Sequence, residues 1–177
     1  MNILVPLISG FEEIEAISVV DILRRAEFNV VTAGIPGTMV EGDNGVKIMA
    51  DKMLKDVNPD EFDAVVLPGG RGSPNLERSE KVMSILKSFN EKEKLIAAIC
   101  FSPVLLAKKG ILKDRRATVY PGRERDLPKP RGERVVVDGN IITSQGPGTA
   151  MEFALKIVEV MAGKPRADSL KKGLVCR

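Results

Sequence analysis

The chain has 177 residues, which is enough for one domain with a substantial hydrophobic core. Hydrophobic residues make up 44% of the chain and charged residues 29%, and the net charge is only +3, so the composition implies no strong attraction for nucleic acid or a membrane surface. Histidine is absent, which excludes a Ser-His or Cys-His catalytic couple within the chain and any histidine-ligated metal.

The cysteine content bounds the cellular compartment. Cys100 and Cys176 are too few for a disulfide framework and too far apart in sequence for a zinc site, which favours a reducing, cytoplasmic location. We expect no signal peptide and no membrane span, because no apolar run has the required length or flanks. We therefore expect a single domain over residues 1–177 that holds neither a metal nor a cofactor.

The first part of the chain alternates between strand and helix patterns. Residues 2–7 are apolar almost throughout, which is typical of a strand in a parallel sheet covered on both faces. A helix is predicted over residues 12–26 and a second strand over residues 28–33. Residues 39–41 and 46–49 flank a Gly-Asp-Asn-Gly turn and predict a small hairpin.

Three glutamates begin the first predicted helix. A favourable interaction with the positive end of the helix dipole is a sufficient explanation for Glu12 and Glu13. Glu15 lies between two apolar residues, and if it faces inwards its carboxylate points at the carboxyl edge of the sheet. An outward Glu15 that only complements the dipole is the alternative.

A glycine-rich loop follows the buried strand that is predicted at residues 63–67. Gly69 and Gly70 in this loop would allow backbone N–H groups to approach a ligand or an oxyanion closely. The spacing fits neither a dinucleotide fingerprint nor a phosphate loop. A tight turn that needs a positive φ is the alternative interpretation.

The stretch around Cys100 is the most informative part of the chain. Residues 95–99 form a short apolar strand, and a helical pattern starts at Ser102, so Cys100 occupies a strand-to-helix turn of the nucleophile-elbow kind. Such a turn projects the side chain from the sheet edge and places it at a helix amino end, where free N–H groups and the dipole lower a thiol pKa. We therefore predict a reactive thiolate; a buried structural cysteine is the alternative.

The second half of the chain continues the alternation. A surface helix is predicted over residues 79–92, a short strand over residues 117–120, and a loop rich in Pro, Gly and charge over residues 121–131. Asp138-Gly139 lies between two apolar runs and predicts a second hairpin.

A second glycine loop, Gly146-Pro147-Gly148, follows the last predicted strand. Thr149 is then expected to cap a helix that ends near residue 162, with Glu152 completing a capping box. Alternating strands and helices predict a parallel sheet with helices on both faces, and ligands of such sheets bind beyond the carboxyl ends of the strands. Glu15, the two glycine loops and Cys100 are therefore expected to meet at one edge.

These segments resemble the ThiJ/PfpI superfamily, in the branch of the parkinsonism-associated protein deglycase. The resemblance implies a flavodoxin-like three-layer α/β/α sandwich with a mostly parallel sheet, a nucleophile-elbow cysteine and assembly as a homodimer. The matching segments follow the family's order through nearly the whole chain: Glu12-Glu13-Ile14-Glu15, Val66-Leu67-Pro68-Gly69-Gly70, residues 95–103 and Ser144-x-Gly146-Pro147-Gly148-Thr149.

The same resemblance implies roles for individual residues. Cys100 corresponds to a reactive thiol that is easily oxidised to a sulfinate, and Glu15 corresponds to a buried, protonated glutamate that is hydrogen-bonded to the sulfur. Gly69 and Gly70 correspond to a loop whose amides face the cysteine, and we expect the amide of Phe101 to join them as an oxyanion donor.

Two positions depart from the family pattern. The deglycase branch has a histidine where this chain has Tyr120, and the peptidase branch has a histidine where this chain has Phe101. Peptidase chemistry is disfavoured because it needs such a base. Glu15 would have to move protons alone, or with the phenol of Tyr120 as a weak acid.

Two functions remain open from the sequence. In the first, Cys100 attacks a small dicarbonyl such as methylglyoxal, or a glycated-protein adduct, while Glu15 shuttles protons. In the second, Cys100 is oxidised without turnover, in a redox-sensing or chaperone-like protein. An intracellular cysteine peptidase is a third, disfavoured interpretation. The expected partners are a small aldehyde or glycated protein and a second copy of the chain, without nucleic acid or membrane; Cys176 is expected to be incidental.

Overall fold

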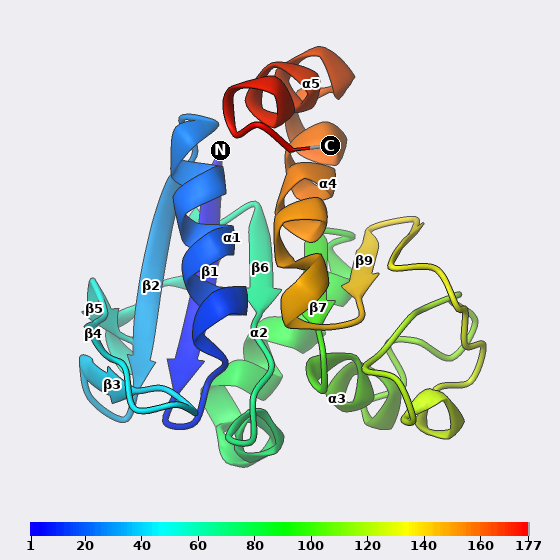
Figure 1. The fold of residues 1–177 in the computed structure, drawn as a ribbon. Coiled ribbons are helices and arrows are strands. Elements are labelled where there is room, and N and C mark those ends of the chain that lie inside the picture. The colour runs from blue at the N-terminus through cyan, green and yellow to red at the C-terminus, as the bar shows by residue number, and fades with distance from the viewer. Residues whose placement is uncertain (177) are drawn as a thin grey trace.

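A seven-stranded sheet lies between two layers of helices in the computed structural model, which describes residues 1–176 (Figure 1). The spatial order is β5-β2-β1-β6-β7-β9-β8, and only β8 runs antiparallel to its neighbour. This is the mostly parallel three-layer sandwich that the sequence predicts. The strands of the sheet are β1 (Asn2–Ile8), β2 (Asn29–Ile35), β5 (Lys52–Met53), β6 (Ala64–Leu67), β7 (Leu95–Ile99), β8 (Val135–Asp138) and β9 (Ile141–Ser144).

The helices divide between the two faces of the sheet. One face is covered by α1 and α4, which lie side by side with α5 packed at their end, and the other face by α2 and α3 (Figure 1). Within residues 1–176, no helix is both long enough and apolar enough to cross a membrane. The helices are α1 (Glu13–Arg25), α2 (Glu80–Glu91), α3 (Ser102–Lys108), α4 (Ala150–Ala162) and α5 (Lys164–Gly173), and short 3-10 turns are η1 (Leu54–Asp56), η2 (Pro59–Glu61), η3 (Ser73–Arg78), η4 (Glu124–Asp126) and η5 (Pro147–Thr149).

The central strands supply two hydrophobic cores because their side chains alternate between the faces of the sheet. On β1, Ile3 and Val5 belong to the core under α1 and α4, whereas Leu4 belongs to the core under α2 and α3. On β6, Val66 and Val65 divide in the same way. Both faces are covered, so these strands are apolar throughout rather than alternating with polar residues.

The strand order places four carboxyl ends next to one another. Strands β1, β6, β7 and β9 are neighbours in the sheet and run in the same direction. The segments that follow these strands therefore start at a common edge, as the sequence predicts.

Both hairpin predictions are confirmed. Strands β3 (Met39–Glu41) and β4 (Lys47–Met49) pair antiparallel as a separate two-stranded sheet, and Gly45 in their turn has a φ of 87°. Strands β8 and β9 pair around Gly139, which has a φ of 60°. A glycine suits both turns because other residues rarely adopt this conformation.

The short strand predicted at residues 117–120 is wrong. Only Ala117 makes a bridge, to Pro130, and the next residues bond to groups outside any strand ladder. The amide of Thr118 donates to the side-chain oxygen of Thr143, and the amide of Tyr120 donates to the carbonyl of Cys100. This segment is extended and buried in part, but its hydrogen bonds hold the elbow instead of a sheet.

The capping box predicted for α4 is also wrong. The hydroxyl of Thr149 turns back to bond Gly146 and the hydroxyl of Ser144, at 2.6 Å from the latter. Glu152 points away and pairs with Arg134 at 2.8 Å. A 3-10 turn precedes α4, so Thr149 stabilises the glycine loop rather than the start of the helix.

The core under α4 yields a stability prediction. Phe153 is fully buried on α4, so Phe153→Ala should lower the free energy of unfolding by about 3–5 kcal/mol in urea titrations. Val160 lies on the same helix and is 44% exposed, so Val160→Ala should change that free energy by less than about 0.5 kcal/mol. Equal losses for the two variants would contradict this packing.

Candidate active site

Cys100 lies at the turn between β7 and α3, with a φ of 65°. A left-handed conformation costs a residue other than glycine about 1–2 kcal/mol. Two backbone hydrogen bonds hold it in place: the Cys100 amide donates to Ser144 and its carbonyl accepts from Tyr120, both at 3.0 Å. The hydroxyl of Ser102 adds a 2.6 Å bond to the carbonyl of Pro68, which ties the start of α3 to the end of β6. The turn is therefore a rigid nucleophile elbow.

Glu15 points inwards to this elbow. Its side chain is fully buried, and one carboxyl oxygen, Oε2, accepts a hydrogen bond of 2.7 Å from the amide of Gly69. The carboxyl group also hydrogen-bonds the thiol of Cys100, while Oε1 has no partner among the described residues. Glu12 caps the helix by accepting from the amide of Glu15 at 2.7 Å, and so fixes the turn that directs Glu15 inwards.

Burial controls the protonation of Glu15. It raises the pKa of this carboxyl group to about 7, despite the opposing hydrogen bonds from Gly69 and Cys100, and the charge of Glu12 adds to the increase. About half of the Glu15 carboxyl groups are therefore protonated at pH 7, where an ordinary glutamate is almost fully ionised.

The predicted lowering of the Cys100 pKa is wrong. Burial, and then the negative charge of Glu15, raise the pKa of the thiol to about 12, although the amides of Gly70 and Phe101 hydrogen-bond the sulfur and act in the opposite direction. The sequence pattern indicated the helix terminus correctly, but it did not show that only 3% of the residue is exposed.

Each of the two groups shifts the pKa of the other. Ionised Glu15 opposes a thiolate next to it, and a protonated Glu15 removes that opposition. The thiolate is consequently favoured in the state in which Glu15 holds the shared proton. A proton can thus pass between the two side chains without a histidine, which the sequence does not contain.

The first glycine loop fits tightly around the pair. A Cβ atom at Gly69 would lie 2.5 Å from Cβ of Cys100 and 2.8 Å from Oε2 of Glu15. Gly70 has a φ of 95°, and a Cβ there would lie 2.3 Å from the carbonyl oxygen of Gly10. No side chain fits at either position, so the loop's backbone can approach the sulfur closely.

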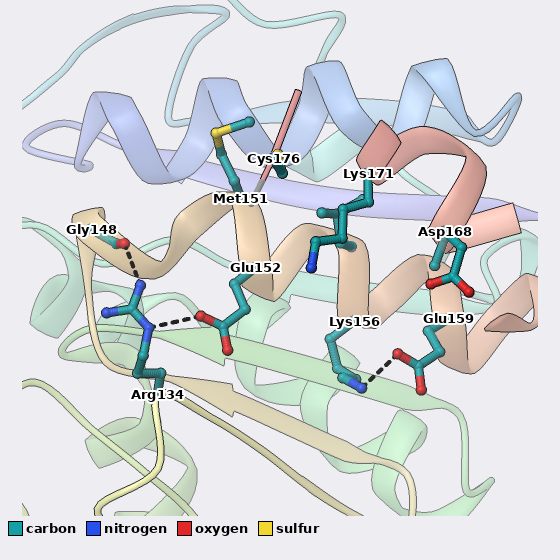
Figure 2. A pocket seen from close by; sticks show the side chains of 11 residues that line it. Arg134, Gly148, Met151, Glu152, Lys156, Glu159, Asp168, Lys171 and Cys176 are labelled. Atoms are coloured by element: carbon teal, nitrogen blue, oxygen red, sulfur yellow. Dashed lines mark hydrogen bonds and ion pairs between the residues drawn. The ribbon is translucent and has the colours of Figure 1, made fainter. Parts of the chain in front are cut away.

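The second glycine loop contributes only in part. A Cβ at Gly146 would lie 3.3 Å from the ring of Tyr120 and 4.0 Å from Oε1 of Glu15, so this residue borders the site. Gly148 instead lines a groove of about 630 Å³ on the outer side of α4, where its carbonyl accepts from Arg134 (Figure 2). Among residues 1–176, no hydrogen bond joins Pro147 to Cys100, and the carbonyl of Pro147 accepts from the amide of Ala150. Cys176 lies in the same groove, apart from the elbow.

Tyr120 lies beside the elbow through its ring. The ring centroids of Tyr120 and Phe101 are 5.0 Å apart, and Tyr120 is 41% exposed. On Phe101, the guanidinium of Arg123 lies 5.6 Å from the ring centroid. Tyr120 therefore forms the outer wall of the site in the position where the sequence resemblance places a histidine.

Some contributors to the site were missed in the sequence. The sequence pattern places Ser102 only at the start of a helix, Thr149 only at a helix cap and Arg123 only in a charged loop. A hydroxyl after an elbow cysteine was an available signal for Ser102, but the contacts of Arg123 depend on the path of the loop. Within residues 1–176, no three His, Cys, Asp or Glu side chains cluster in a way that would hold a metal ion.

The geometry defines the class of the protein. A cysteine on a strained strand-to-helix turn, a buried carboxyl group bonded to it and two backbone amides at the sulfur make a reactive-cysteine site on a three-layer α/β/α fold. The chain belongs to the DJ-1/PfpI family, whose pattern matches residues 1–160.

Three relatives illustrate the range of the family. Protein DJ-1 homolog B of Arabidopsis thaliana is 42% identical over 97% of this chain, which spans 40% of that protein's length. Glutathione-independent glyoxalase DJR-1.2 of Caenorhabditis elegans is 38% identical, with 92% of this chain and 89% of the relative covered. Deglycase PYRAB04690 of Pyrococcus abyssi is 33% identical, with coverages of 91% and 99%.

Solved structures agree with the fold. Drosophila melanogaster DJ-1beta superposes with a TM-score of 0.95 at 43% identity, covering 99% of this chain and 98% of its own. Oxidised Toxoplasma gondii DJ-1 superposes with a TM-score of 0.95 at 37% identity, covering 98% of this chain and 97% of its own.

The coupled titration yields a prediction about pH. Once one proton has left the pair, the remaining proton is divided between Glu15 and Cys100 in a ratio that does not depend on pH. The rate of Cys100 alkylation by iodoacetamide should therefore rise up to about pH 7 and then level off well below pH 12. A glutamine side chain cannot take the proton, so in Glu15→Gln the rate should rise steadily with pH and show no step near pH 7. Identical pH profiles for the two proteins, measured by mass spectrometry of the Cys100 peptide, would refute the coupling.

Proposed function

We propose that the chain is a reactive-cysteine enzyme that acts on small dicarbonyls or on their adducts with proteins, with Cys100 as the nucleophile. The observation that carries this proposal is the buried, proton-holding Glu15 in hydrogen-bond contact with the Cys100 thiol. Family relatives named as a glyoxalase and a deglycase support the same class of chemistry. The enzyme needs no histidine because Glu15 stores the proton that the thiol releases.

The first step forms a carbon–sulfur bond. The Cys100 thiolate attacks the aldehyde carbon of methylglyoxal, and the carbonyl electron pair moves to the oxygen. The amides of Gly70 and Phe101, which hydrogen-bond the resting sulfur, are placed to hold this oxyanion. Glu15 then donates its proton to the oxygen and gives a neutral hemithioacetal.

The following steps move a proton between two carbons. Ionised Glu15 removes the proton from the carbon bonded to sulfur, which leaves an enediolate. Glu15 then returns this proton to the neighbouring carbon, and the hydroxyl proton of the sulfur-bearing carbon moves to the enediolate oxygen, which gives a thioester of lactate. Water hydrolyses the thioester, which releases lactate and regenerates the thiol. The sum is one methylglyoxal plus one water giving one lactic acid. On a glycated protein, the same attack would end with release of the amine.

Tyr120 is assigned to the wall of the site. Its ring contacts Phe101 and borders Gly146, whereas its hydroxyl makes no hydrogen bond within residues 1–176. The ring therefore limits the space next to the sulfur, and the proposed reaction assigns the proton transfers to Glu15 rather than to the phenol.

Turnover of methylglyoxal to lactate tests the proposal. Cys100→Ser should lower kcat/KM at least a hundredfold because an alcohol is a far weaker nucleophile at neutral pH. Tyr120→Phe keeps the ring and should stay within about threefold of the wild type, whereas Cys176→Ser should be unchanged. Turnover that survives in Cys100→Ser would exclude this site, and a large loss in Tyr120→Phe would assign the phenol a chemical role.

A redox function is the second candidate, and it is favoured by Oε1 of Glu15, which is buried and has no hydrogen-bond partner within residues 1–176. A thiolate that takes one oxygen atom from hydrogen peroxide becomes a sulfenate and releases water, and a second peroxide gives a sulfinate. A protonated Glu15 next to Cys100 would donate its proton to a sulfinate oxygen. Absence of turnover, together with a gain of two oxygen atoms on Cys100 under mild peroxide, would favour this function over the enzyme.

We further propose that the protein is a cytoplasmic homodimer. Its two cysteines are free among the described residues, which fits a reducing compartment. Ile14 and Ile17 lie on adjacent turns of α1 and are 57% and 45% exposed. Val46 in the hairpin is also exposed, and it lies next to α1 because its amide donates to the carboxylate of Glu13. A twofold dimer brings the same surface of both subunits together, so this exposed apolar face would be covered by its own copy.

The dimer proposal has a direct test. Ile17→Glu places a charge on the α1 face and should convert a dimer into a monomer in light scattering coupled to gel filtration. Lys87→Glu, an exposed position on α2 in the opposite layer, is the matched control and should leave the mass unchanged. A wild-type monomer, or a dimer that persists in Ile17→Glu, would contradict the assignment of this face.

A further inference from the structure

We infer that Asp43, in the turn of the β3–β4 hairpin, is a positioning residue for the reaction at Cys100. Through Arg71 it fixes the peptide on the far side of Gly70, and Gly70 supplies one of the two amides at the sulfur. The inference deepens the proposed function and rests on Cys100 as the nucleophile. The hairpin is separate from the main sheet, so nothing in the sheet itself assigns it a part in the site.

Asp43 holds Arg71 through three hydrogen bonds. Its Oδ2 accepts from the Arg71 amide at 3.2 Å, its Oδ1 accepts from Nε at 2.5 Å, and its carbonyl oxygen accepts from Nη2 at 2.9 Å. The side chain of Asp43 is only 17% exposed, whereas that of Arg71 is 77% exposed. The carboxylate is thus the buried partner of this pair. The bond that holds the glycine loop in place is the one that the backbone amide of Arg71 donates to it.

The position of this bond explains its consequence for Gly70. The Cα atom of Gly70 joins two peptide planes, and glycine by itself leaves both free to rotate. On one side, the carbonyl of Gly69 accepts from the amide of Glu12 at 3.0 Å. On the other side, the amide of Arg71 is held by Asp43, and the carbonyl of Gly70 accepts from the hydroxyl of Ser73 at 2.9 Å.

The N–H of Gly70 lies in the first of these planes, which the bond to Glu12 holds. Asp43 and Ser73 hold the second plane, and so limit the rotation about the Cα atom of Gly70 that would tilt the first. The amide lowers the thiol pKa only while it points at the sulfur. A donor that is already aimed needs no reorganisation when charge develops on the reacting atoms.

The hairpin turn is itself anchored, so Asp43 offers a rigid support. The amide of Asp43 donates to the carbonyl of Phe11 at 2.8 Å. The carboxylate of Glu13 accepts from the amide and the side chain of Asn44, at 2.6 and 3.0 Å. A Cβ at Gly42 would lie 2.4 Å from the carboxylate of Glu13, so the turn fits against α1 without a gap. Glu13 consequently does more than complement the helix dipole, which was the role that the sequence indicated for it.

Graded substitutions test the inference. Asp43→Ala removes all side-chain acceptors and should lower kcat for methylglyoxal about tenfold with KM within twofold, because the Gly70 amide is misdirected rather than removed. Arg71→Ala keeps the backbone bond and should cost only about threefold, as should Asp43→Asn, which keeps one acceptor. Asp60→Asn breaks a comparable exposed ion pair, with Lys92, and should leave kcat unchanged.

A second readout does not depend on turnover. In a Cys176→Ser background, the rate of Cys100 alkylation at pH 8 should fall in the same order as kcat, since a weaker amide bond to the sulfur leaves less thiolate. Thermal unfolding of each variant identifies any that do not fold, and Asp43→Asn and Arg71→Ala then carry the test. If the wild type shows no turnover, the proposed function fails while the alkylation series still decides the role of Asp43. A folded Asp43→Ala whose alkylation rate equals or exceeds that of the wild type would overturn the inference.

Discussion

A carboxyl group and a thiol share one proton in a buried contact, and the rest of the site is arranged around that contact. Burial raises the pKa of Glu15 to about 7 and that of Cys100 to about 12, so at neutral pH the thiol keeps its proton and Glu15 is about half ionised. The amides of Gly70 and Phe101 favour a negative sulfur, and the proton-bearing Glu15 tolerates it. In the proposed function, the reactivity of Cys100 therefore comes from the transfer of a proton within this pair, rather than from a base elsewhere in the chain.

The fold supplies what this contact needs. Neighbouring parallel strands bring the segments after β1, β6, β7 and β9 to one edge of the sheet. Cys100 is held in a left-handed conformation by backbone bonds to Ser144 and Tyr120, which offset the strain of that turn. The glycine loop completes the enclosure because any side chain at Gly69 would collide with Cys100 and Glu15. The backbone hydrogen bonds that stabilise the turn at Cys100 are thus the same bonds that hold its thiol in the site.

Much of this could be predicted from the sequence, because the apolar runs and the glycine turns act locally. The sandwich, both hairpins, the elbow and the placement of Glu15 follow from periodicity, turn chemistry and the family resemblance. The thiol pKa was predicted with the wrong sign because burial is a tertiary property, and a helix start says nothing about the surrounding walls. The strand predicted at residues 117–120 is wrong because the amide of Thr118 bonds to Thr143, which is distant in sequence. The cap predicted at Thr149 is wrong because its hydroxyl bonds to Ser144, which precedes the helix, and not to the first turn of the helix. The role of Asp43 could not be predicted either, because its partner Arg71 is distant in sequence.

The most direct measurement of the shared proton is infrared difference spectroscopy of Glu15 during a pH titration, with the signal assigned by its loss in Glu15→Gln. The absorption of the protonated carboxyl group should disappear around pH 7, and the midpoint should move in Cys100→Ala, which removes a hydrogen bond that lowers the Glu15 pKa. A midpoint near the ordinary value of 4.5, unchanged in Cys100→Ala, would show that Glu15 is ionised at neutral pH and would contradict the account.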